Sequence, residues 1–270
     1  MRVLLATDGG SAAHSAGTLL ARIGARSGVE VTVLAVASFD LALEAAEELG
    51  RYSAETARTR VDEIARAAAE RLANEGLKAR SAVSEGHPAA EILQAVEDEG
   101  YELTVVGAGR ESWLGQLMLG SVGTAVLQAS PSAVLIVHDL REDAEEVRVL
   151  LGTDGSEGAD RAVRTLLELA DPARCSVVVM SVATSTSAEA PADAATHGER
   201  ATSLLREAGF TAELRISSGH PGRLLLEEAT RGDHDLVVVG SRGTSRVRRA
   251  VLGSVSDQLV RRSRATLVGR

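Results

Sequence analysis

The stretch that decides the fold runs from residue 234 to 258 and reads "HDLVVVGSRGTSRVRRAVLGSVSDQ". Its first part, "HDLVVV", is a short apolar run rich in β-branched residues, which is typical of a buried strand. Glycines follow at positions 240, 243 and 253, and a serine follows at 254. A buried strand has no use for glycines at this spacing. We therefore interpret them as a loop that holds a ligand against its backbone.

The chain contains a near copy of this stretch, "GAGRESWLGQLMLGSV" at 107–122, in which an arginine replaces the middle glycine. Two further pairs of segments match along the chain. "VLLATDGGSAAHSA" at 3–16 resembles "VLLGTDGSEGADRA" at 149–162, and "SEGHPAAEIL" at 84–93 resembles "SSGHPGRLLL" at 217–226. Repeats this long indicate a tandem duplication of a whole domain. We place domain one at 1–142 and domain two at 143–270, joined by the acidic linker "REDAEEVR" at 141–148.

Apolar runs alternate with helical patterns in both copies. In copy one, "RVLLAT" and "EVTVLAVA" read as strands, and residues 11–27 and 53–75 read as helices. Strands that alternate with helices predict a parallel sheet covered on both faces. The predicted fold class is α/β, with two tandem doubly wound domains that each hold a five-stranded parallel sheet (Rossmann-like or flavodoxin-like).

The candidate site lies where the strands of copy two end. Open α/β sheets bind ligands at the carboxyl ends of their strands, and Asp154 directly follows the first strand. Gly240 turns the chain, Gly243 leaves the backbone open to an anion, and the helix that starts after Gly253 favours negative charge. Taken alone, Gly240 is explained as well by a turn and Ser254 by a helix cap. The whole spacing, together with Asp154, favours a binding site.

The pattern Gly-x2-Gly-x9-Gly-Ser after a strand, with "TDGS" after the first strand, resembles the universal stress protein family over nearly all of both copies. The resemblance implies a five-stranded parallel fold that binds ATP, with Mg²⁺ as the accompanying ion. It places the adenine and ribose end at Asp154 and Val182, and the ribose and phosphates at Gly240, Gly243, Gly253 and Ser254. The counterparts in copy one are Asp8, Val36, Gly107, Gly120 and Ser121.

Copy one departs from the family pattern at Arg110, where the second glycine of the loop is expected. Gly109 stands one residue earlier and compensates in part. Arg110 either blocks the approach of a ligand to the backbone or pairs with a phosphate. The hypothesis is that copy two binds ATP, and that copy one binds it more weakly or not at all.

Several classes of enzyme are disfavoured. Lys78 is the only lysine, and the P-loop pattern that ends in Gly-Lys-Ser/Thr is absent from the sequence. Cys175 is the only cysteine and reads as a buried small hydrophobe, and the histidines have no metal-ligand spacing. His87 and His220 precede prolines and read as helix starts. We predict no catalytic and no metal-binding residues, and at most slow ATP hydrolysis.

Composition limits the partners. The net charge is −9 and aromatic residues make up 2%, which argues against nucleic-acid binding. The N-terminus lacks a signal-peptide pattern and no apolar run is long enough to span a bilayer, so we expect a cytoplasmic protein with no membrane insertion. The segment from Arg242 to Arg270 has eight arginines and one acid. A solvated helix face and a local anion site explain this segment equally well.

Three functional classes remain. The favoured one is an ATP-binding, nucleotide-dependent regulator of a stress response, whose protein partner the sequence does not identify. The alternatives are a nucleotide-free dimerisation or interaction module and, less favoured, an ATP-dependent enzyme. The family resemblance implies dimerisation through the last strand, so we expect "AVLIVH" and "ATLVG" to pair within one chain as an internal pseudo-dimer, which leaves other surfaces for a possible homodimer of two chains. The insert at 39–60 is either a contact surface or a solvated helix face.

Overall fold

The computed structural model describes residues 1–24, 28–38, 54–108, 119–141, 146–184, 189–243 and 252–270. The elements of the first domain are β1 (Arg2–Ala6), α1 (Ser11–Ile23), β2 (Glu30–Ala37), α3 (Ala54–Asn74), β3 (Lys78–Glu85), α4 (Pro88–Glu99), β4 (Leu103–Gly107), α5 (Ser121–Ala129) and β5 (Ala133–Val137). The second domain repeats this order with β6 (Val147–Thr153), α6 (Glu157–Leu169), β7 (Cys175–Ala183), α7 (Ala190–Glu207), β8 (Thr211–Ser218), α8 (Pro221–Arg231), β9 (Leu236–Gly240), α9 (Ser254–Val260) and β10 (Ala265–Gly269).

The ten strands form one sheet in the order β3-β2-β1-β4-β5-β10-β9-β6-β7-β8. Within each half the neighbouring strands are parallel, which confirms the predicted pair of five-stranded doubly wound domains. The two halves meet where β5 pairs with β10 in antiparallel fashion, with Leu135 opposite Leu267. The predicted pairing of the last strands within one chain is therefore confirmed. Because this central pair is antiparallel, the carboxyl ends of the strands in the two domains face opposite edges of the sheet.

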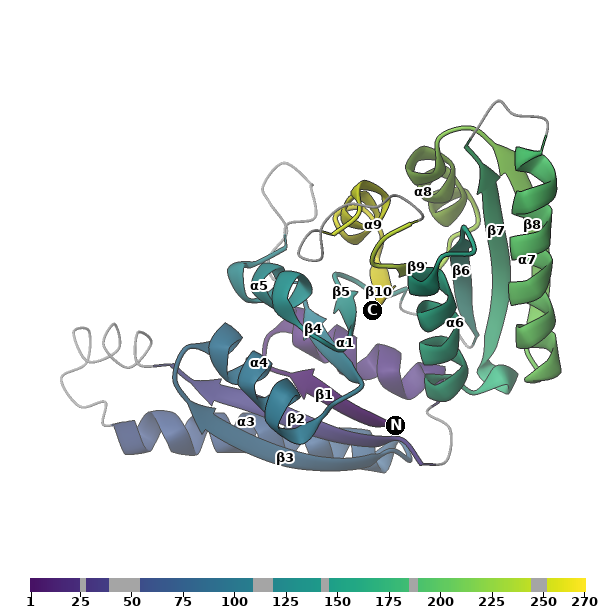
Figure 1. Cartoon of the computed structure of the whole chain (residues 1–270). Helices are drawn as coiled ribbons and strands as arrows, with labels where there is room; N and C mark the ends of the chain where they lie inside the picture. Colours follow the sequence, from purple (N-terminus) through teal and green to yellow (C-terminus); the bar gives the residue numbers. More distant parts are fainter. Residues whose placement is uncertain (25–27, 39–53, 109–118, 142–145, 185–188, 244–251) are drawn as a thin grey trace.

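Helices cover both faces of the sheet (Figure 1). In the first domain α1 packs with α3 and α4 packs with α5, and in the second α6 packs with α7 and α8 with α9. One of the apolar clusters runs across the boundary between the domains, and includes Leu5, Leu135, Leu166 and Leu267. The two domains therefore share buried surface, and substitutions in this core are expected to affect both. None of the described helices is long and apolar enough to cross a membrane.

Two predicted boundaries change. The helix predicted over 11–27 ends at Ile23, because Gly24 follows it in the left-handed region at a φ of 64° and caps the helix. The predicted linker at 141–148 is shorter, because β6 already begins at Val147. Its residues 142–145, which include the proposed boundary between 142 and 143, lie outside the described residues. Of the insert at 39–60, residues 39–53 also lie outside them, and the rest begins α3.

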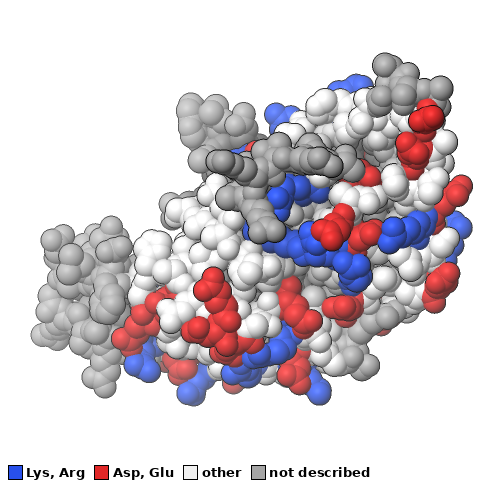
Figure 2. Space-filling view, viewed as in Figure 1, with Lys and Arg blue, Asp and Glu red and all other residues white. Residues whose placement is uncertain are grey.

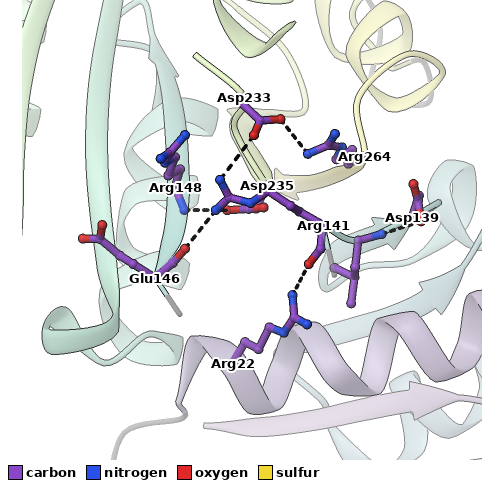
Figure 3. Close-up of polar contacts among 9 residues, drawn as sticks. Arg22, Asp139, Arg141, Glu146, Arg148, Asp233, Asp235 and Arg264 are labelled. Carbon is purple, nitrogen blue, oxygen red and sulfur yellow. Dashed lines mark hydrogen bonds and ion pairs between the residues drawn. The ribbon is translucent and has the colours of Figure 1, made fainter. Parts of the chain in front are cut away.

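The linker is anchored by charge at its first residue (Figure 3). Arg141 lies 2.9 Å from the buried carboxylate of Asp235 and 3.3 Å from Asp233. Asp233 also binds Arg264 at 2.8 Å, and Asp235 accepts the backbone N–H of Arg148 at 2.8 Å. Burial acts to raise the pKa of Asp233, but the charges of Arg264 and Arg141 hold it below its usual value. The chain thus enters the second domain through a network of paired charges.

The arginines near the C-terminus have specific partners. Basic side chains gather across the middle of the face in Figure 2, where the two domains meet. Arg261 pairs with Asp257 at 3.1 Å, and Arg270 donates to the carbonyl oxygens that end α5, including that of Ser130 at 2.6 Å. Arg261 therefore lies on a solvated helix face, as one of the two interpretations predicts, whereas Arg270 has a structural role that neither interpretation includes. Arg246, Arg248 and Arg249 lie outside the described residues.

Candidate functional site

The second domain has a cavity of about 340 Å³ at the carboxyl ends of its strands. The cavity lies across the end of β6, between β7 and α7 on one side and the end of β9 and the start of α9 on the other. This is the edge at which open α/β sheets bind ligands, and the volume is within the range of small-molecule sites. The lining includes four of the predicted site residues, Asp154, Val182, Gly240 and Gly243, and also Met180, Asp193, His197, Arg242, Val255 and Ser256.

Asp154 stands in a tight turn between β6 and α6. Its Oδ1 accepts the backbone N–H of Ser156 at 3.0 Å, and Gly155 has a φ of 72°, which favours glycine. The turn after β1 has the same construction, because Asp8 Oδ1 accepts the N–H of Gly10 at 2.8 Å and Gly9 has a φ of 79°. Each aspartate therefore shapes its turn with one oxygen, and this geometry is common to both copies.

The glycine that ends the fourth strand has a packing role. A Cβ on Gly240 would lie 2.5 Å from the backbone of Gly158 and Ala159 at the start of α6. A Cβ on Gly107 would lie 2.5 Å from the backbone of Ala12 and Ala13 in α1. The expected role of Gly240 as a turn is therefore incomplete, since the glycine also lets a helix approach the strand closely.

Gly243 brings the glycine loop against Asp154. A Cβ at this position would lie 2.5 Å from Asp154 Oδ2. The loop is held there by Ser156, whose hydroxyl donates to the carbonyl oxygen of Arg242 at 3.2 Å and accepts the N–H of Ala159 at 3.3 Å. The main chain at Gly243 therefore lies beside the Asp154 carboxylate in the lining of the cavity, and Ser156 is a residue that sequence reasoning missed.

Gly253 and Ser254 begin α9 as expected, but neither is among the residues that line the cavity. Gly253 is the N-cap residue and donates its N–H to Ser241 O at 2.8 Å, while no side chain caps the helix. The interpretation of Ser254 as a cap is therefore wrong. Ser256 ties the helix to the loop instead, by donating its hydroxyl to Gly240 O at 2.7 Å. No local pattern distinguishes Ser256, because its role depends on how α9 docks against β9.

The counterparts in the first domain gather at the carboxyl edge of that domain's strands. Asp8 follows β1, which lies between β2, with Val36, and β4, which ends at Gly107. Gly120 is the N-cap residue of α5 and Ser121 is its first residue. Gly109 and Arg110 lie outside the described residues, so the hypothesis that Arg110 weakens the first site stays a prediction.

Cys175, His87 and His220, which the sequence analysis interprets as structural, lie at a buried strand start and at two helix N-termini. Cys175 begins β7 and is 1% exposed, and burial raises the pKa of its thiol to about 12. His87 and His220 are the N-cap residues of α4 and α8, and His220 Nδ1 accepts the N–H of Arg223 at 3.4 Å. Within the described ranges, no group of three His, Cys, Asp or Glu side chains is placed to hold a metal ion.

A doubly wound α/β fold with a cavity at the strand ends defines the class of small-ligand-binding proteins that includes the nucleotide-binding folds. Within that class the universal stress protein family model matches the chain twice, over residues 1–138 and 147–268. The chain therefore belongs to the universal stress protein family, as a member with two tandem domains.

Similar proteins support this assignment. A universal stress protein of Mycolicibacterium smegmatis is 30% identical over 171 residues, which are 58% of each chain. One of Methanocaldococcus jannaschii is 30% identical over 106 residues, covering 39% of this chain and 63% of the relative. The chain thus spans 58% and 63% of these two curated relatives. The crystal structure of a universal stress protein from Archaeoglobus fulgidus matches all of this chain and 98% of its own, with a TM-score of 0.72 and 25% identity.

Proposed function

We propose that the protein binds ATP in the cavity of its second domain and acts in the cytoplasm as a nucleotide-dependent regulator of a stress response. The observation that carries this proposal is the cavity itself, which brings Asp154, Val182, Gly240 and Gly243 together from three neighbouring strand ends. These residues are the ones that the family resemblance assigns to the nucleotide. Asp154 and Val182 would hold the adenine and ribose end, and the glycine loop with Gly253 and Ser254 would hold the ribose and phosphates.

The two sides of the cavity differ in a way that suits a nucleotide. Arg242 brings a positive charge to the β9 side of the cavity, where Gly243 has no side chain, and both features would favour phosphates. Met180, Val182 and Ala183 supply an apolar wall on the β7 side, which favours a base. A ligand with a flat apolar part and an anionic part therefore fits the cavity better than a wholly polar one does.

Magnesium would accompany the nucleotide rather than occupy a site of its own. Mg²⁺ in nucleotide sites is held largely by phosphate oxygens and water. We expect Mg²⁺ to enter with ATP, and hydrolysis to be slow at most.

The internal pairing of β5 with β10 leaves β3 and β8 as the outer strands of the sheet. A homodimer of two chains stays a prediction.

The first test is to denature freshly purified protein and to quantify the released adenine nucleotide per chain by chromatography. About one nucleotide per chain supports an intact site in the second domain only. About two would mean that the first domain tolerates Arg110. No bound nucleotide, and no binding of added ATP with Mg²⁺, would contradict the proposal and favour the nucleotide-free interaction module.

A matched pair of variants assigns the nucleotide to a domain. Asp154→Ala removes the carboxylate beside the loop of the second domain, and Asp8→Ala makes the same change in the first. We expect Asp154→Ala to lose bound ATP and Asp8→Ala to retain it. Equal losses in the two variants would show that the asymmetry between the copies is wrong.

A further inference from the structure

The side chain that covers the turn after the first strand differs between the two domains. In the second domain a Cβ on Gly155 would run into the ring of His197, so the imidazole of His197 packs against the main chain of that turn. In the first domain Ile64 holds the same place, since a Cβ on Gly9 would lie 3.2 Å from Ile64 Cδ1. The duplicated turn is therefore covered by an aliphatic side chain in one copy and by an aromatic, polar one in the other.

His197 is placed to meet a ligand. It projects from α7 into the lining of the cavity, together with Asp193, which stands one helical turn earlier. The His197 ring is partly exposed, and none of the hydrogen bonds or ion pairs formed by the described residues engages it. Nδ1 and Cε1 are the ring atoms nearest the turn, which leaves Nε2 as the nitrogen for a ligand in the cavity, whereas Ile64 has no polar atom to offer in the first domain.

The surroundings of His197 select the part of the ligand that it meets. The carboxylate of Asp193 repels phosphates from this side of the cavity, and the apolar residues of β7 beside it favour a flat, uncharged group. Phosphates are drawn instead to Arg242 on the β9 side. An imidazole offers both a face for stacking and a nitrogen for a hydrogen bond, so it suits the edge and face of a nucleobase.

We infer that His197 is a specificity-determining residue of the second domain, which contacts the base of the bound nucleotide by stacking and by one hydrogen bond. The inference rests on the proposed nucleotide-binding function and deepens it. It also gives a reason, independent of Arg110, for the two domains to differ in affinity. Ile64 can stack against a base only weakly and forms no hydrogen bond with it.

The test compares a ligand that has a base with one that lacks it. Binding of ATP and of inorganic tripolyphosphate to the full chain is measured by calorimetry for the wild type, His197→Ile and His197→Phe. We expect His197→Ile to weaken ATP binding about tenfold, which is the effect of one hydrogen bond and one stacking contact. His197→Phe keeps the stacking and is expected to lose about threefold. Tripolyphosphate affinity is expected to stay within about twofold in both variants.

Controls separate the contact from damage to the fold. Glu199→Ala changes an exposed residue of the same helix that is not among the cavity-lining residues, and its ATP affinity is expected to match that of the wild type. Unchanged ATP binding by His197→Ile, or an equal loss for ATP and tripolyphosphate, would overturn the inference while leaving the proposed function in place. A wild-type chain that binds no ATP would overturn both.

Discussion

The two domains share a backbone frame and differ in the side chains placed on it. Both have an Asp-Gly turn after the first strand, with a carboxylate oxygen that accepts the N–H two residues on. In the second domain the next residue is Ser156, which ties the turn to the glycine loop, while in the first domain it is Gly10, which has no side chain to form this bond. The comparison shows that both domains keep the Asp-Gly turn after the first strand, and that they differ in the side chain that joins this turn to the glycine loop.

The largest expected effect tests the shared frame. Gly240→Ala and Gly107→Ala each place a Cβ 2.5 Å from the backbone of a helix, so either variant should lower the free energy of unfolding by about 2–4 kcal/mol. Urea denaturation measures this loss. Gly120→Ala is the control, because open space surrounds its Cβ, and it should cost less than about 1 kcal/mol. If Gly240→Ala or Gly107→Ala has the free energy of unfolding of the wild type, the helix does not approach that glycine closely.

A second prediction compares two carboxylates that each bind two arginines, Glu228 of α8 and Glu99 of α4. Glu228 is 3% exposed and is bound by Arg215 and Arg231, with His234 Nε2 at 3.6 Å. Burial acts to raise the pKa of Glu228, but the hydrogen bond from Arg231 and the charge of Arg215 hold it below its usual value. This stabilisation is present above about pH 4.3, the unfolded pKa, and is lost as the pH falls through the lowered folded pKa.

Glu228→Gln should therefore cost about 2 kcal/mol at pH 7 and make acid unfolding less steep. The comparison in the first domain is Glu99, which binds Arg2 at 2.8 Å and Arg80 at 2.9 Å but is 44% exposed. Because solvent screens exposed pairs, Glu99→Gln should cost less than about 1 kcal/mol. Chemical denaturation of both variants between pH 3 and 7 measures the difference, and equal costs would show that burial does not distinguish the two sites.

A third prediction isolates the asymmetry of the turn. Ser156→Ala removes the cap of α6 and the bond to Arg242 O. It should lower the free energy of unfolding by about 1 kcal/mol and weaken ATP binding severalfold, because the loop loses its anchor. Thermal denaturation and calorimetry measure the two effects. Ser254→Ala serves as the stability control, since Ser254 caps nothing, and a stability loss equal to that of Ser156→Ala would refute the assigned roles.

The smallest expected effect lies at the boundary between the domains. His138 Nε2 donates to Val260 O, which ends α9, at 2.6 Å, and Arg270 makes the corresponding contacts to the end of α5. Burial lowers the pKa of His138, although its bond to Val260 O opposes this. A lowered folded pKa means that the stabilisation is present above about pH 6.5, the unfolded pKa, and is lost as the pH falls below that value.

The free energy of unfolding should therefore fall less between pH 7 and pH 5 in His138→Gln than in the wild type, by less than about 1 kcal/mol. Arg270→Lys keeps a charge that does not titrate in this range and should leave the decline unchanged. Urea denaturation at pH 5, 6 and 7 provides the measurement. If His138→Gln leaves the slope unchanged as well, His138 does not titrate with folding.

Local pattern was enough to predict much of this protein. The alternation of apolar strands with amphipathic helices, the Asp-Gly turns and the repeated segments all reflect short-range geometry, and they predicted two doubly wound domains with sites at the strand ends. The pairing of "AVLIVH" with "ATLVG" was predicted from the family resemblance, and β5 does pair with β10 in antiparallel fashion. The extent of the helix over 11–27 was not, since Gly24 ends it early.

Other features depend on how the elements dock. Ser156 meets Arg242 across 86 residues of sequence, Arg270 reaches the end of α5 from the last strand of the other domain, and His197 covers Gly155 from another helix. No local period encodes such contacts, because they are fixed only when helices pack on the sheet and the two halves of the sheet join. The sequence by itself determined the frame of this universal stress protein, and the tertiary structure decided which side chains surround its candidate ligand.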